Sequence, residues 1–141
     1  MPMILEHIDA IARKKGRDVL FLDFPQKMID DEYDFFVDAD WDNLPVRLQV
    51  IAWLDKNQIE WSECGHVANE NIMCGYRGRI YIDVPFDTEN SVFQKLSSYF
   101  ETQDGVMKID GVVFCYLPLD VAMQNAHHDE PGFWDRWAEN F

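Results

Sequence analysis

The sequence predicts an α+β fold in which helices pack on one face of a mostly antiparallel sheet. Segments with helical spacing and short strand-like segments follow in the order helix, strand, helix, several strands, helix, strands, helical tail. No repeat, low-complexity tract or linker divides the 141 residues, so we expect a single domain over residues 1–141. Hydrophobic residues make up 48% of the chain and aromatic residues 14%, which is enough material for a core.

The N-terminal segment has the pattern of an amphipathic helix followed by a buried strand. Apolar residues recur at helical spacing from about residue 3 to residue 15. Three basic residues in the last turn complement the helix dipole, and Gly16 follows as a C-cap. Residues 19–22 form a continuous apolar run between two aspartates, which predicts a strand buried on both faces.

The middle of the chain predicts two further helices with strands between them. Pro45 is placed to begin a helix that runs to about residue 57. Residues 59–67 and 72–76 are typical of strands, and residues 79–84 alternate between apolar and polar side chains. We expect Asp87 or Thr88 to cap the third helix, which ends before Asp104.

The C-terminal third predicts a hairpin and a helical tail. Asp110-Gly111 divides a β-rich stretch over residues 106–117, which is the strongest hairpin signal in the chain. A short helix over residues 120–126 and a terminal helix after Pro131 follow. Residues 18–117 are compatible with a split βαβ core of the ferredoxin-like kind, an analogy of fold that carries no function.

The charge balance excludes some partners and favours others. Twelve Lys and Arg residues face 26 Asp and Glu residues, so the formal net charge is −14. This charge disfavours nucleic acid and anionic membrane surfaces as partners. It would attract a basic protein and speed its capture, although an acidic surface also serves solubility alone.

The segment over residues 30–42 concentrates this acidity. It contains seven acids and no base, with aromatic residues between the acids. Buried aromatics supply binding energy at interfaces while charges steer the partner, so the segment is a candidate docking surface. The tail adds two tryptophans beside further acids. The predicted partner-binding residues are Asp30, Asp31, Glu32, Tyr33, Asp34, Phe35, Asp38, Asp40, Trp41, Asp42, Trp134 and Trp137. A solvated loop and a core-packed tail are the competing interpretations.

No motif assigns a catalytic residue, a metal ligand or a cofactor. Residues 38–42 match the start of a calcium loop, but Asn43 stands at the glycine position and Gln49 at the position of the bidentate glutamate. The same aspartates lack the later motifs of aspartate-phosphorylating phosphatases. Cys64 and His66 lack the second ligand pair of a zinc site. Residues 127–130 are interpreted as a hydrophilic loop before the last helix.

Cysteine usage and the N-terminus predict a cytoplasmic protein. Cys64, Cys74 and Cys115 are too few for a disulfide framework, and we expect buried, reduced thiols. The first residues lack the basic start and apolar run of a signal peptide. No apolar stretch approaches the roughly 20 residues that span a bilayer.

Two functional hypotheses follow. The first is an acidic protein-binding module, such as an immunity or antitoxin-type inhibitor, that docks on a basic toxin or nuclease. The alternative is a small enzyme or ligand-binding domain with a pocket over the sheet, whose candidate polar groups are Asp23, Arg77, Tyr81 and His66. A self-associating subunit that uses the tryptophan-rich tail is a weaker third option.

Overall fold

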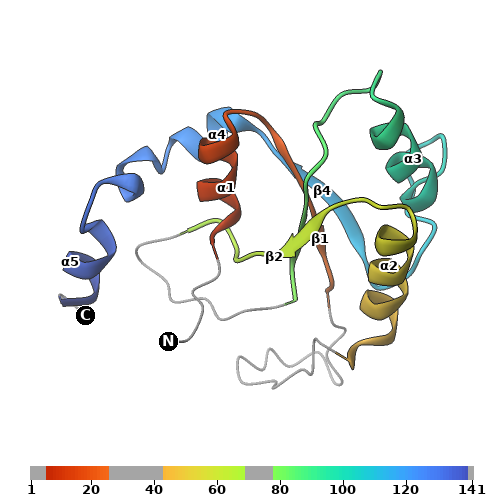
Figure 1. Ribbon diagram of the computed structural model, residues 1–141, viewed down its shortest axis with the longest axis horizontal. Helices are drawn as coiled ribbons and strands as arrows, with labels where there is room; N and C mark the ends of the chain where they lie inside the picture. The colour runs from red at the N-terminus through yellow and green to blue at the C-terminus, as the bar shows by residue number, and fades with distance from the viewer. Residues whose placement is uncertain (1–5, 26–42, 69–77, 140–141) are drawn as a thin grey trace.

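The α+β class and the antiparallel sheet are confirmed by the computed structural model, which describes residues 6–25, 43–68 and 78–139 (Figure 1). In these parts of the chain the sheet has four strands in the order β2-β3-β1-β4, and each neighbouring pair is antiparallel. The strands are β1 (Val19–Asp23), β2 (Trp61–Glu63), β3 (Ile80–Ile82) and β4 (Val113–Leu117).

The helices connect these strands in the order of a split βαβ core. They are α1 (Ile8–Lys15), α2 (Pro45–Lys56), α3 (Ser91–Phe100), α4 (Leu119–Met123) and α5 (Phe133–Glu139), with a 3-10 helix over Ala126–Asp129. The chain runs β1-α2-β2-β3-α3-β4, so each crossover helix joins two parallel strands that have an antiparallel strand between them. This is the ferredoxin-like arrangement expected for residues 18–117.

The helices cover both faces of the sheet, which corrects the prediction of one covered face. We call the face with Leu20, Leu22, Ile80 and Ile82 the crossover face, because α2 and α3 pack on it. The opposite face, with Phe21, Tyr81 and Leu117, is covered by α1 and α4, and we call it the terminal face. The crossover helices do share one face, and the second layer comes from helices outside the split βαβ core.

Strand β1 lies at the centre of the sheet and is buried on both faces, as its continuous apolar run predicts. Strand β3 is also buried on both faces, which its alternating pattern does not predict. The side chain on the expected polar face is Tyr81, which is only 5% exposed because α1 and α4 cover that face. A neighbouring layer of helices therefore overrides the amphipathic pattern.

Several predicted boundaries are wrong. Helix α1 begins at Ile8 rather than near residue 3, with Glu6 and His7 outside it. The cap of α3 is Asn90, whose side-chain oxygen accepts from the backbone N–H groups of Val92 and Phe93. The stretch over residues 59–67 forms a strand only at Trp61–Glu63, and residues 72–76 lie outside the described chain.

The predicted hairpin at Asp110-Gly111 is also wrong. The dipeptide forms a turn, with Gly111 at a φ of 86°, but only its C-terminal arm is a strand. The other arm makes a single bridge between Glu101 and Met107. The turn residues thus predict the local backbone correctly and the long-range pairing incorrectly.

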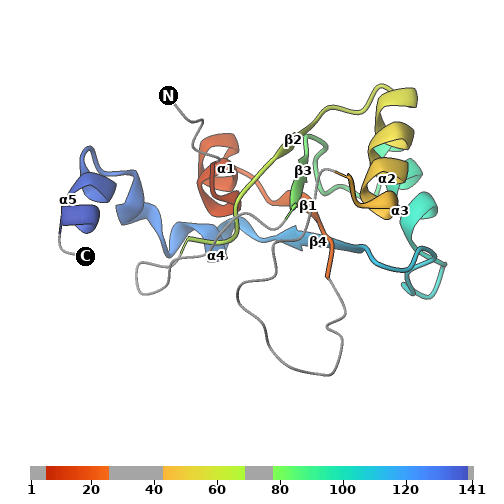
Figure 2. The same cartoon turned by 90° about the horizontal axis from the view of Figure 1, so that it is seen from below.

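Helix α5 lies at one end of the molecule, far from α2 and α3, in both views (Figures 1 and 2). It has no fully buried residue. Within the described segments, no helix is long and apolar enough to cross a membrane.

Candidate functional site

The predicted partner-binding residues divide into two groups. The ten residues from Asp30 to Asp42 lie outside the described chain, as do Arg77 and Cys74 and the calcium-like stretch over residues 38–42. Trp134 and Trp137 are described, and both are half-buried on α5. The structure therefore places only the tail of the predicted docking surface.

The two tryptophans belong to an aromatic cluster with histidines. The Trp134 ring lies 4.8 Å from that of His128, 5.5 Å from that of His7 and 5.5 Å from that of Trp137, between ring centroids. Phe133 stacks on His128 at 4.7 Å. These contacts hold α5 against the start of α1 and against the 3-10 helix. The tail is thus attached to the domain, with part of each indole still accessible.

Residues 127–130, interpreted as a hydrophilic loop, are exposed except for His128, and Ala126–Asp129 form a 3-10 helix. His128 is only 4% exposed. Asp129 accepts two hydrogen bonds from the Arg13 guanidinium, at 2.7 and 2.8 Å. Only His128 of this run therefore contributes to the interior, and a sequence pattern of adjacent polar residues gives no sign of it.

Arg13 connects Asp129 to a second, fully buried carboxylate. Asp9 accepts hydrogen bonds from Arg13, from the Asn125 amide and from the Ala68 backbone N–H, at 2.9 to 3.0 Å. Burial alone would raise the pKa of Asp9, but these donors together hold it below its usual value. Hydrogen bonds from Arg13 likewise lower the pKa of Asp129. The network fastens α1 to the C-terminal segment and has a structural role.

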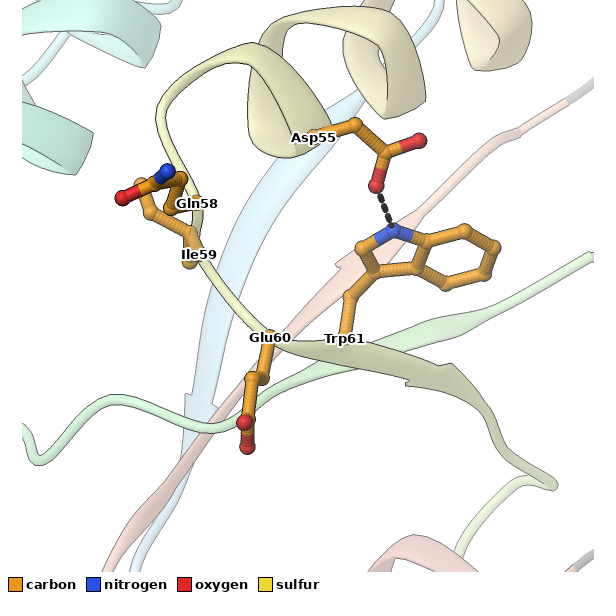
Figure 3. A pocket seen from close by; sticks show the side chains of 5 residues that line it. All are labelled: Asp55, Gln58, Ile59, Glu60 and Trp61. Carbon is orange, nitrogen blue, oxygen red and sulfur yellow. Dashed lines mark hydrogen bonds between the residues drawn. The ribbon is translucent and has the colours of Figure 1, made fainter.

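An open hollow of about 430 Å³ lies where α2 leads into β2 (Figure 3). Its lining residues are Asp55, Gln58, Ile59, Glu60 and Trp61. The indole N–H of Trp61 donates to the Asp55 carboxylate at 2.8 Å, which fixes the ring beside the hollow. Glu60 points to the other side of the chain in this view. The lining contains two acids, one tryptophan and no base.

The chain turns at the hollow through an unusual helix end. Gln58 follows α2 with a φ of 58°, a left-handed conformation in which glycine is usual. Its N–H donates to the carbonyl of Asp55, and the N–H of Ile59 donates to the carbonyl of Leu54. These two bonds form a Schellman motif, and Ile59 and Leu54 meet in the core. The motif directs the chain so that Trp61 returns beside Asp55.

No protein-family model, curated protein or solved structure matches this chain. Its function has to be argued from its own residues.

The polar residues proposed to line a pocket in a small enzyme or ligand-binding domain contact different partners. Asp23 pairs with Arg79 at 3.4 Å on the terminal face. Tyr81 donates to Asp83 at 2.7 Å, and burial followed by this bond raises the pKa of Tyr81 to about 12. The carbonyl of His66 accepts from the ring of His7. Asp23, Tyr81 and His66 therefore do not come together in one site.

Burial disfavours the thiolate form of both described cysteines. Cys64 is fully buried, and this burial raises its pKa to about 12. Cys115 is half-buried rather than buried as expected, and its pKa is also raised by burial. Within the described residues, no three His, Cys, Asp or Glu side chains gather in a way that could hold a metal ion.

Sequence reasoning missed the hollow because nothing in the local pattern marks it. Asp55 and Trp61 are six residues apart, one on a helix and one on a strand. Their contact depends on the left-handed turn at Gln58, a residue type that rarely adopts this conformation. A glycine there would have signalled the turn, and glutamine does not.

Proposed function

We propose that this chain is an acidic protein-binding module that docks on a basic protein, as an immunity or antitoxin-type inhibitor docks on a cytoplasmic toxin or nuclease. The observation that carries the proposal is the hollow at the end of α2, where the Asp55 carboxylate holds the Trp61 ring and the lining contains no base. A lysine or arginine side chain of a partner fits this chemistry, because a cation binds both to carboxylates and to the face of an indole ring.

Two further features support the same proposal. The net charge of −14 would accelerate encounter with a basic partner over a distance of several ångströms. The acidic segment over residues 30–42 and the half-buried Trp134 and Trp137 remain predicted contact surfaces, with aromatic anchors of the kind that dominate binding energy.

The proposal is tested by capture of basic proteins from a native cell lysate on the immobilised full chain, followed by mass spectrometry. The captured protein is then purified, and its association rate is measured at low and at high salt. We expect association to slow by about tenfold or more at high salt, because screening removes the steering. Replacing Trp61 by Ala should mainly speed dissociation, since it removes a contact rather than a charge.

Two triple variants distinguish an effect of total charge from an effect of charge in residues 30–42. Asp38→Asn/Asp40→Asn/Asp42→Asn and the control Glu101→Gln/Asp104→Asn/Asp110→Asn remove the same charge. We expect the first to slow association more than the second. Equal rates in the two triple variants would overturn the role of residues 30–42. Failure to capture any basic protein would overturn the proposed function itself.

A further inference from the structure

The two edge strands of the sheet are protected to different degrees. Strand β2 is only three residues long and carries Glu63, which pairs with the buried Arg47 at 3.1 Å. Strand β4 is five residues long, Val-Phe-Cys-Tyr-Leu, with no charge and no proline. Its inner edge pairs with β1, and no strand of the described chain pairs with its outer edge. Proteins usually shield such an edge with short length, charge or proline.

Apolar side chains remain exposed beside the outer edge of β4. Tyr116 is 51% exposed and stacks on Phe86, with ring centroids 4.6 Å apart and an interplanar angle of 19°. Phe86 is itself 42% exposed and contacts Phe93 in the core of the crossover face. On the other side of the strand, Val113 is 39% exposed. The outer edge of β4 thus presents backbone N–H and C=O groups, unpaired by any described strand, beside the exposed, stacked rings of Tyr116 and Phe86.

The surroundings of this edge are acidic. Asp87 follows Phe86 directly, Glu89 lies three residues after Phe86, and Asp120 lies three residues after the end of β4; all three are exposed. The segments over residues 83–94 and 109–135 contain no lysine or arginine. An added strand that carries basic side chains is therefore complementary in charge. A second copy of this chain is not, since each copy has a net charge of −14.

We propose that the outer edge of β4 binds an extended basic segment of the partner protein as a fifth strand. This inference rests on the proposed function and specifies how the partner docks. Main-chain hydrogen bonds to β4 supply affinity, and alternate side chains of the added strand read the surface. Apolar residues of the segment contact Tyr116 and Phe86, while lysine or arginine residues face Asp87, Glu89 and Asp120.

The test uses a fluorescent synthetic peptide of about seven residues, in which lysine or arginine alternates with valine or tyrosine. Binding to the full chain is measured by anisotropy. A peptide of the same sequence with N-methylated backbone nitrogens at alternate positions tests the main-chain bonds. The variant Tyr116→Lys places a like charge on the edge, and Leu48→Lys is the control, because Leu48 is similarly exposed, at 48%, on α2.

We expect the plain peptide to bind, and both N-methylation and Tyr116→Lys to weaken binding by about tenfold or more, with Leu48→Lys near wild type. Tyr116 is exposed, so the variant should fold, and circular dichroism checks this. Equal binding of plain and N-methylated peptides, or equal effects of the two lysine variants, would overturn the edge proposal while leaving salt-dependent partner capture intact. A wild-type dimer that Tyr116→Lys dissociates would also overturn it, in favour of pairing between two copies.

Discussion

The crossover face and the terminal face of the sheet differ in the balance between apolar packing and polar contacts. Among the described residues, thirteen buried apolar side chains form the core of the crossover face and nine that of the terminal face. The larger cluster contains three phenylalanines, and α2, which packs on this face, also carries the buried Arg47, which donates to Glu63 and to the carbonyl of Gly78. The smaller one includes two alanines and a cysteine, and it borders the buried Asp9 and Arg13.

The difference shows how hydrogen bonds position the helices on the terminal face, where the apolar core is small. Burial of apolar surface stabilises in proportion to area and specifies little about angle. On the terminal face, Arg13 donates to Asp9, to Asp129 and to the carbonyl of Ala122, so α1, α4 and the 3-10 helix have fixed relative positions. Asp18 adds a bond from the N–H of Leu119 at 2.7 Å. Hydrogen bonds therefore order a segment that apolar burial alone would leave less constrained.

The largest effect is expected for Leu96→Ala on the crossover face. Leu96 is fully buried on α3, and its truncation removes transfer free energy and leaves a cavity. We expect the free energy of unfolding, measured by urea denaturation, to fall by about 2–5 kcal/mol. Val92→Ala on the same helix is the control, since Val92 is 37% exposed and should cost only about 0.5 kcal/mol. Similar losses for the two variants would contradict the described core.

A smaller loss is expected for Arg13→Met on the terminal face. Methionine preserves much of the volume but removes the donors to Asp9 and Asp129. Asp9 keeps the Asn125 amide and the Ala68 N–H, so we expect a loss of about 1.5–3 kcal/mol rather than complete unfolding. The control Arg17→Met breaks the more exposed pair with Asp83 and should cost less than about 1 kcal/mol. A loss larger than that of Leu96→Ala would reverse the ranking of the two faces.

The pH dependence of this loss identifies its electrostatic part. The folded pKa values of Asp9 and Asp129 lie below the ordinary value of about 3.9. Their stabilisation is therefore fully present above that value and is lost as the pH falls through the folded pKa values. The difference between wild type and Arg13→Met should be constant from about pH 7 to pH 5 and should shrink below about pH 4. A difference that is independent of pH would assign the loss to volume alone.

The sequence predicts one face of this molecule better than the other. The apolar run of β1 and the Pro45 start of α2 are local signals that the structure confirms; on the terminal face the Gly16 cap of α1, with φ 67°, is one such signal. The crossover core follows from such patterns, because helical and strand periodicity report burial directly. Local turn chemistry at Asp110-Gly111 did not determine which strands pair, since pairing depends on β1, which is far away in sequence.

The terminal face and the candidate site could not be predicted in this way. Arg13 and Asp129 are separated by 116 residues, and the basic cluster at the end of α1 is explained as well by the helix dipole. No periodicity reveals that Tyr81 is covered or that Asp55 meets Trp61. The Arg13–Asp129 pair leaves no local pattern because its members are far apart in sequence. The hollow is local in sequence but depends on a left-handed turn at Gln58, which this residue type does not signal, and the unpaired edge of β4 is apparent only in the folded sheet.

The smallest effect is expected at the turn between α2 and β2, where Gln58→Gly should stabilise the protein. Gln58 is exposed and adopts a left-handed conformation that glycine adopts without strain, so the substitution should raise the free energy of unfolding by about 0.5–1 kcal/mol. Asn57→Gly serves as the control, because Asn57 has a φ of −93° and donates to the Trp53 carbonyl, and it should destabilise. Stabilisation with unchanged partner capture would indicate that the turn only directs the chain. Stabilisation with weaker capture would assign the Gln58 amide to the hollow's binding surface, and a loss of stability would contradict the described helix end.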